Sequence, residues 1–312
     1  MRNIGPFMEE AIVPARVLCV GVAVQDNMFA IERLPSEPTK VFARDFCQVG
    51  GGPAANAAVT VAQLGGKASL WARVGADAVG AGIVSELAGY GVDTARVKQI
   101  PDRRSGVSAV LIDGNGERSI VAFADRKLDT DTNWLPRELP ADIDAILCDV
   151  RWPAASEHVM KLARDTRIPI VLDADLTDDD AVGRLFGMAT HVVFSSPALR
   201  RHTGRAAIDE ALKQAQDQTK GVVAVTRGAE GFSWLEDGAV RSIPAMRVDV
   251  VDTLAAGDVF HGAFALGLGE GHRTEGAGQF ATAAAALKCT RWGGRSGIPT
   301  RRELDDFIAT AA

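Results

Sequence analysis

The sequence predicts an α/β fold in which a mostly parallel sheet is covered by helices. Apolar, β-rich runs alternate with helical patterns along the 312 residues, which is typical of that class. The strand-like runs span residues 17–24, 68–74, 143–150, 168–173, 191–194 and 222–226, and helical patterns begin at residues 53 and 78. Two regions, 27–47 and 103–124, break the alternation with short strand-like pieces that no helix separates. Because ligands of such sheets bind beyond the carboxyl ends of the strands, we expect the functional site there.

Residues 252–258 are the most informative segment of the chain. They read Asp-Thr-Leu-Ala-Ala-Gly-Asp and directly precede an apolar stretch with helical periodicity. The first-turn amides of a helix attract anions, and the small residues Ala255, Ala256 and Gly257 would let a phosphate approach them closely. A carboxylate at Asp258 would repel that phosphate unless it takes a proton from an attacking nucleophile. The segment therefore predicts phosphoryl transfer to a hydroxyl, with simple capping of the helix as the alternative.

A second glycine-rich junction between a strand and a helix lies at residues 50–58, which read Gly-Gly-Gly-Pro-Ala-Ala-Asn-Ala-Ala. Further short motifs are Val-Gly-Ala-Asp at 74–77 and Val-Thr-Arg-Gly-Ala-Glu-Gly at 225–231. In order and spacing, these segments and residues 252–258 resemble the ribokinase-like, or pfkB, family of carbohydrate kinases over nearly the whole chain. The resemblance implies a three-layer α/β sandwich with a mostly parallel central sheet and a small β lid.

The resemblance also divides the chain into two interleaved parts. We expect the α/β domain to comprise residues 16–26, 48–102 and 125–312, and the lid to comprise residues 27–47 and 103–124. Residues 1–15 are expected to form a flexible N-terminus. The lid strands are partly apolar, and their outer face would need a partner, so we predict a homodimer formed through the lids.

Composition narrows the possible partners and the location. The formal net charge of -6, without a basic stripe, argues against nucleic-acid binding. The four cysteines lie far apart, without a Cys-x-x-Cys motif, and we interpret them as reduced, buried thiols: Cys19, Cys47, Cys148 and Cys289. No run of residues has the length and apolarity of a signal peptide core or a membrane span. We therefore predict a cytoplasmic protein that contacts no membrane.

The family roles can be carried over to matching positions of this sequence. Asp258 would be the base that activates a sugar hydroxyl, while the amides of Ala255, Ala256 and Gly257 would hold the migrating phosphoryl group. Ala255 stands where many relatives have glycine, so its backbone must adopt a conformation that alanine tolerates. The sugar hydroxyls would be bound by two side chains and two backbone amides, those of Asp26, Asn56, Gly51 and Gly52. For Asp26, a local turn at the end of a strand is the alternative.

The nucleotide side carries fewer signals. ATP is the implied phosphoryl donor, Thr226 and Gly228 match the loop that binds its phosphates and ribose, and the segment from Lys288 to Gly294 would line the adenine pocket. An Asn-x-x-Glu motif that helps to place Mg²⁺ in the family should fall at residues 195–198. These residues read Ser-Ser-Pro-Ala and lack both polar ends.

Magnesium placement therefore needs other oxygen atoms. Asp252 is our candidate metal residue, with Asp173 as a further one, and weakened catalysis is the alternative. The resemblance also implies a monovalent cation such as K⁺ between the backbone around Asp252 and the loop at residues 293–294.

The substrate class is predicted from short sequence segments that are similar to those of one group of kinases within the family. Strings at residues 49–53, 149–152 and 288–291 are most similar to those of sulfofructose kinases. Arg151 follows a strand, so its guanidinium could bind a sulfonate, phosphate or carboxylate at the carboxyl edge of the sheet, and Lys40 on the lid could add a second charge. A solvated surface cation is the alternative for both residues, and it is less favoured for Arg151, which is flanked by a strand and Trp152. Ala122 stands where those kinases place a polar amide, which removes one donor from the pocket.

We therefore predict an ATP-dependent kinase for a ketose or an acidic sugar, with 6-deoxy-6-sulfofructose, converted to its 1-phosphate, as the leading candidate. Fructose, ribose, 2-keto-3-deoxygluconate and a nucleoside are alternatives. A nucleoside would require lid phenylalanines that stack on the base, and these can equally be lid core. A sugar- or nucleotide-binding regulator without catalysis is the alternative from another class.

Overall fold

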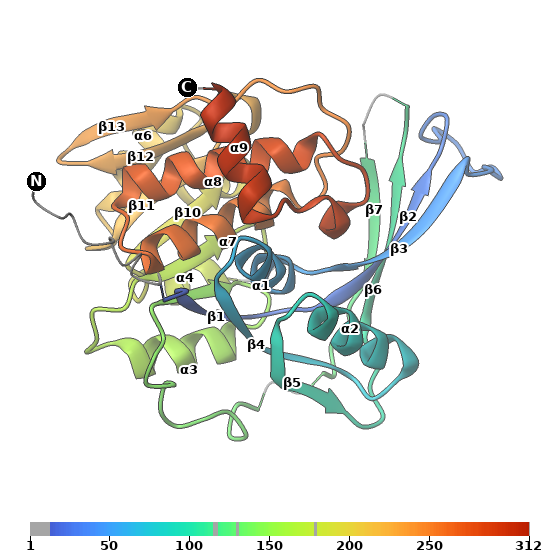
Figure 1. The fold of residues 1–312 in the computed structure, drawn as a ribbon, viewed down its shortest axis with the longest axis horizontal. Helices are drawn as coiled ribbons and strands as arrows, with labels where there is room; N and C mark the ends of the chain where they lie inside the picture. The colour runs from blue at the N-terminus through green and yellow to red at the C-terminus, as the bar shows by residue number, and fades with distance from the viewer. Residues whose placement is uncertain (1–12, 115–117, 129–130, 178–179, 312) are drawn as a thin grey trace, which may run out of the picture.

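The computed structural model describes residues 13–114, 118–128, 131–177 and 180–311 (Figure 1). Most of the N-terminal segment that we expect to be flexible, residues 1–12, lies outside this range. The described chain contains a large sheet covered by helices and a smaller sheet that projects from one side.

The large sheet has nine strands in the order β13-β12-β11-β10-β9-β8-β1-β4-β5. Their bounds are β1 Arg16–Val20, β4 Lys67–Gly75, β5 Asp93–Ile100, β8 Ala145–Asp149, β9 Ile170–Ala174, β10 His191–Ser195, β11 Val222–Thr226, β12 Phe232–Glu236 and β13 Ala239–Ile243. Every pairing from β5 to β11 is parallel, and the two remaining pairings at one edge, β11–β12 and β12–β13, are antiparallel. The predicted fold class is confirmed, because each predicted strand belongs to this parallel part.

Helices cover both faces of the large sheet. One layer is built from α1 Pro53–Gln63, α2 Ala78–Gly89, α7 Ala256–Gly269, α8 Thr274–Cys289 and α9 Arg301–Ala311. The other layer is built from α3 Pro153–Ala163, α4 Ala181–Phe186, α5 Ser196–Thr203 and α6 Ile208–Gln216. Successive residues of a strand face opposite sides, and so Val17 of β1 packs in the first layer while Leu18 packs in the second. Both faces are thus buried, as expected for a parallel sheet.

The small sheet has four strands in the order β3-β2-β6-β7. Their bounds are β2 Val24–Ala30, β3 Asp45–Gly51, β6 Gly106–Ile112 and β7 Arg118–Phe123. Met28, Val110 and Ile112 are buried on one face of this sheet, and Leu254 and Trp292 pack against them. The small sheet therefore contacts the turn that precedes α7 and the loop around the short 3₁₀ helix η2 Gly294–Gly297. The division of the chain into two domains stays a prediction.

Two predictions about composition can be compared with the described chain. Among its helices, none combines the length and the apolar character that crossing a bilayer requires. The four cysteines carry no disulfide, and Cys19 and Cys148 are buried as predicted. The predicted burial is wrong for Cys47 and Cys289, which are partly exposed; Cys47 lies on an outer strand of the small sheet and Cys289 at the end of α8.

Candidate active site

Asp258 lies in the first turn of α7, and Asn56 faces it from α1. The Asn56 amide donates a hydrogen bond from Nδ2 to Asp258 Oδ2 at 2.6 Å. The two helices approach closely because Gly262 has no side chain; a Cβ atom there would lie 2.6 Å from the carbonyl oxygen of Ala57. Residues 202 positions apart in the sequence are thus brought into direct contact.

The environment of Asp258 favours the neutral form of its carboxyl group. Desolvation by burial raises the pKa of Asp258 from 3.8 to about 7. Repulsion from Asp173, when that carboxyl is ionised, adds to the rise, and the hydrogen bond from Asn56 opposes it. A carboxylate with a pKa near neutrality is suited to accept a proton at physiological pH.

The turn at residues 253–257, which we call the anion turn, precedes Asp258. Ala255 adopts a left-handed conformation with φ of 63° and is the N-cap of α7. A left-handed residue followed by right-handed ones forms a concave group of amides that binds anions. No protein atom of the described chain accepts a hydrogen bond from the amides of Ala255 or Gly257. The turn therefore offers donors to a ligand, at the cost of about 1–3 kcal/mol of backbone strain at Ala255.

A buried arginine organises the predicted sugar-binding residues. Arg295 is 1% exposed; its Nε donates to Asn56 Oδ1 at 2.9 Å and its Nη2 donates to the Gly51 carbonyl at 3.0 Å. Asp26 lies against Gly51, because a Cβ atom on that glycine would be 2.2 Å from Asp26 Oδ2. The structure thus brings together Asp26, Gly51, Asn56 and Asp258, four of the predicted residues.

Arg295 is also the positive charge that lies among the acidic side chains of this group. Its Nη1 lies 3.5 Å from Glu86 Oε2, and the charges of Arg295 and Asp26 influence each other. Burial raises the pKa of Asp26, while a hydrogen bond from Ser108 and the charge of Arg295 oppose that rise. Sequence reasoning missed Arg295, although it directly follows residues 293–294, the loop at which the resemblance implies a monovalent cation.

Gly52, the remaining predicted sugar-binding residue, begins α1. It is the N-cap, with φ of 95°, and its carbonyl accepts a hydrogen bond from the Asn56 amide at 2.8 Å. A Cβ atom at Gly52 would lie 2.5 Å from the Val22 carbonyl oxygen, so only glycine fits here. Gly52 therefore fixes the direction in which α1 leaves β3 and presents Asn56.

Asp149, which sequence reasoning did not assign, ties three segments together at the carboxyl end of β8. Its fully buried carboxylate accepts hydrogen bonds from the amides of Val22, Ala54 and Arg151 at 2.8, 3.2 and 2.8 Å. These amides belong to the segment after β1, the start of α1 and the turn after β8. The carboxylate thereby holds the start of α1 in place beneath Asn56.

Asp252 and Lys288 form a second buried group directly before the anion turn. Lys288 Nζ lies 3.2 Å from Asp252 Oδ2, and both side chains are almost completely buried. Asp252 Oδ2 also accepts hydrogen bonds from the amides of Gly293 and Gly294 at 3.2 and 2.9 Å. A contact of Lys288 with adenine would have to use its aliphatic part, because its ammonium group is engaged by Asp252.

A third group lies where β9 and β10 end. Arg151 Nη2 is 3.2 Å from Asp175 Oδ2, and Ser195 Oγ donates to the other oxygen of Asp175 at 2.9 Å. His261 of α7 lies 3.6 Å from Asp173 Oδ1. Burial lowers the pKa of His261 and raises that of Asp173 well above its usual value, so both groups favour their neutral forms.

The sequence model of the pfkB family carbohydrate kinases matches residues 14–301. The chain belongs to this family. This kinase is 28% identical to a ribokinase from Bacillus subtilis (strain 168), over 94% of its own chain and 100% of that relative. A solved structure from Agrobacterium tumefaciens, which provisionally carries the name ribokinase, is 39% identical, with a TM-score of 0.90 over 96% of this chain and 98% of that one. The Arabidopsis thaliana ribokinase structure with ribose and ATP is 26% identical, with a TM-score of 0.79 over 95% and 99%.

These matches confirm the predicted enzyme class and the ribokinase-like fold. The protein is an ATP-dependent carbohydrate kinase at the level of its family. Its relatives also include deoxyribokinases and a fructokinase. The finer likeness to sulfofructose kinases stays a prediction.

Three predicted residues of this kinase lie apart from the Asp258 group. Thr226 ends β11, where its hydroxyl donates to the Phe194 carbonyl at 3.3 Å, and Gly228 begins the 3₁₀ helix η1 Gly228–Glu230 on the surface. Lys40 is exposed, and its ammonium lies 6.0 Å from the ring centre of Phe42. The first two residues lie at the carboxyl edge of the sheet, as a nucleotide loop requires, and their roles stay predictions.

The carboxylates that could bind Mg²⁺ differ in whether their oxygen atoms are already engaged in contacts within the chain or are exposed. The Asp252 carboxylate already accepts three backbone hydrogen bonds and pairs with Lys288. In the described part of the chain, no group of three His, Cys, Asp or Glu residues is arranged around a common metal position. The side chain of Asp175 is 41% exposed, which makes it the more accessible carboxylate of the β9 end. Phosphate oxygens and waters usually complete a Mg²⁺ site of this type.

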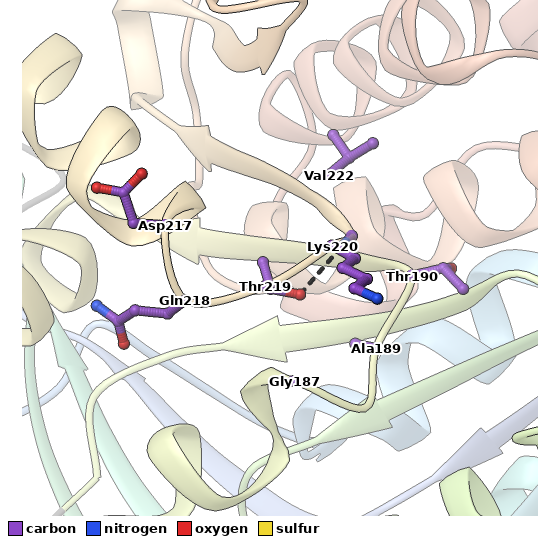
Figure 2. Close-up of a pocket in the computed structure, with 9 residues that line it drawn as sticks. Gly187, Ala189, Thr190, Asp217, Gln218, Thr219, Lys220 and Val222 are labelled. Atoms are coloured by element: carbon purple, nitrogen blue, oxygen red, sulfur yellow. Dashed lines mark hydrogen bonds between the residues drawn. The ribbon is translucent and has the colours of Figure 1, made fainter.

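A large hollow elsewhere on the surface does not belong to this site. It has a volume of about 650 Å³ and lies at the amino ends of β10 and β11, between Thr190 and Val222 (Figure 2). The Thr219 hydroxyl there accepts a hydrogen bond from the Gly221 amide at 3.0 Å. Asp258 and the anion turn are at the opposite edge of the sheet, where ligands of α/β folds bind.

Proposed function

We propose that the protein transfers the γ-phosphoryl group of ATP to a hydroxyl of a neutral sugar such as ribose or fructose. The supporting observation is the group formed by Asp26, Asn56, Arg295 and Asp258, which combines hydrogen-bond donors and acceptors. Its one buried cation, Arg295, already pairs with Glu86 and is attracted by the charge of Asp26. An acceptor with its own negative charge would therefore be disfavoured next to Asp26.

In this proposal, each part of the site has one task. Asp26 and Asn56 orient the sugar, and Asp258 takes the proton from the hydroxyl that attacks the γ-phosphorus. The amides of the anion turn stabilise the charge of the transferring phosphoryl group, and the loop of Thr226 and Gly228 binds the nucleotide. Mg²⁺ would neutralise phosphate charge, with Asp175 as the accessible carboxylate.

An acidic ketose, with 6-deoxy-6-sulfofructose as its leading example, is the second candidate. It is favoured by Arg151, whose guanidinium is 40% exposed at the carboxyl end of β8. Because its partner Asp175 is similarly exposed, solvent screens their ion pair and a sulfonate could replace it at low cost. Lys40 could add a second charge if the loop that carries it moved towards the site.

The deciding experiment is an ADP-release assay with ATP and Mg²⁺ across ribose, fructose, 6-deoxy-6-sulfofructose, 2-keto-3-deoxygluconate and adenosine. We expect turnover with a neutral sugar, loss of roughly 10²–10⁴-fold in Asp258→Asn, and little change in Arg151→Ala. Preference for acidic sugars with a raised KM in Arg151→Ala would establish the second candidate. ATP binding without turnover of any acceptor would refute both and favour the binding-only alternative.

A further inference from the structure

Lys288 is a buried cation that contacts Asp252, the residue directly before the anion turn. It lies in the last turn of α8 and its side chain is 0% exposed. Its Nζ donates a hydrogen bond to the carbonyl oxygen of Asp252 at 2.9 Å and lies 3.2 Å from Oδ2 of the same residue. The carboxyl end of a helix carries a partial negative charge, which also favours a cation at this position.

The residue that Lys288 contacts joins three segments of the chain. Asp252 Oδ1 accepts a hydrogen bond from the Leu254 amide of the anion turn, and Oδ2 accepts bonds from Gly293 and Gly294 of the η2 loop. The amide of Asp252 donates to the Cys289 carbonyl of α8 at 3.1 Å. The conformation of the anion turn therefore depends on Asp252, and a buried carboxylate needs a nearby positive charge.

The resemblance to pfkB kinases implies that a monovalent cation such as K⁺ lies between the backbone around Asp252 and residues 293–294. The oxygen atoms found there do not fit an added cation, because the Asp252 carbonyl and Oδ2 already face the Lys288 ammonium. A metal ion bound to the same oxygens would be repelled by that ammonium at short range.

We infer that Lys288 supplies this positive charge from within the chain, so that the kinase needs no monovalent metal cation. Lys288 is then a positioning residue, which acts on the phosphoryl group only through Asp252 and the anion turn. The inference rests on the proposed kinase activity and adds a property that the choice of sugar does not affect.

The wild-type enzyme provides the first test. Its turnover is measured with the best sugar in the chlorides of K⁺, Na⁺ and tetramethylammonium at equal ionic strength, together with its thermal unfolding midpoint in each salt. We expect rates within about twofold of each other and equal midpoints. Activation by K⁺ of roughly tenfold, or a K⁺-specific rise in the midpoint, would overturn the inference.

Two variants give the second test. Lys288→Ala removes the ammonium and leaves room, and we expect its kcat to fall by roughly tenfold or more in tetramethylammonium and to recover at least in part with K⁺. Lys288→Met removes the charge but fills the space, so K⁺ should restore little activity. Lys213→Met, at an exposed position of α6, is the matched control and should behave as the wild type.

The outcomes separate this inference from the proposed function. Normal, salt-independent kcat in Lys288→Ala would overturn the positioning role. If both Lys288 variants fail to fold, the salt series on the wild type still decides the inference. If the wild type turns over no sugar, the proposed function fails, and the K⁺ dependence of its unfolding midpoint still tests the absence of a metal cation.

Discussion

At the scale of one residue, the burial of Asp258 has opposite consequences for function and stability. Catalysis requires the ionised carboxyl, whereas the folded state favours the neutral one. Its folded-state pKa of about 7 lies above the ordinary value of 3.8, so the folded protein holds this proton over a pH range where the unfolded chain has lost it. The stability contributed by the neutral carboxyl is therefore greatest at low pH and is lost as the pH rises towards 7. The ionised form of Asp258, which destabilises the folded protein, is the form that can act as a base.

We predict that kcat/KM of the wild type rises with pH about a midpoint near 7, because only the ionised Asp258 accepts the proton. Asp258→Asn should lose this dependence together with its activity. At pH 8, where the wild type buries a charge, this variant should unfold several degrees higher than the wild type, with a smaller difference at pH 5. Calorimetry at both pH values checks this, and an equal difference at both would contradict the assigned pKa.

The residues around Asp258 show which parts of the site the sequence could reveal. Asp258 and Asn56 follow small-residue turns that open helices, so their neighbourhood predicts a ligand without knowledge of the fold. Arg295 could not be assigned in this way, because its role depends on contacts with Gly51 and Asn56, more than 200 positions earlier in the chain. An arginine is usually exposed, and only the folded chain shows that this one is buried.

At the scale of elements, the sequence predicted the strands of the parallel part better than the sheet edges. The inner strands are continuous apolar runs, whereas β5 mixes charged and apolar residues because one of its edges is open. The β12–β13 hairpin was missed, although its Asp237-Gly238 turn, with φ values of 50° and 75°, is a typical two-residue hairpin signal.

The small sheet and the anion turn are coupled elements. Leu254 of the turn packs against the buried face of the sheet, and Arg118 of β7 donates a hydrogen bond from Nη1 to the hydroxyl of Thr253. The exposed guanidinium of Arg118 therefore lies at the turn that offers its free amides to a phosphate. Movement of the sheet would carry this charge towards or away from the transferring group.

We predict that Arg118→Gln lowers kcat/KM by about tenfold while the unfolding midpoint stays unchanged, because an exposed cation that contacts phosphate contributes to binding rather than to folding. The matched control is Arg96→Gln, at an exposed position of β5. Initial rates at varied concentrations of ATP and of sugar show which ligand is affected. The fall in kcat/KM should be largest for ATP. Equal kinetics in the two variants would show that the Thr253 contact has no role in turnover.

At the scale of the whole molecule, the small sheet combines open strand edges with exposed apolar side chains. Within the described segments of the chain, its outer strands β3 and β7 each have one edge that pairs with no further strand. Large apolar side chains are exposed on these strands and on the loop before β3; they are Val41, Phe42, Phe46, Ile120 and Val121. Phe42 and Val121 are exposed by 82% and 71%. Such a combination of open edges and apolar side chains is typical of an interaction surface or of an aggregation risk.

A second copy of the chain is the partner that we predict for this surface, because a dimer formed through the small sheets would cover both sets of apolar residues at once. A stable interface of this kind buries about 800 Å² on each partner. Light scattering at micromolar concentration should then give a mass of twice 32.9 kDa. Val121→Glu places a charge in the interface and should shift the protein to the monomer, whereas Val13→Glu, at a similarly exposed valine outside the small sheet, should not. A monomeric wild type at this concentration would remove the dimer. The small sheet would then be held over the anion turn by contacts within one chain, which include those with Leu254 and Trp292 and the hydrogen bond from Arg118 to Thr253.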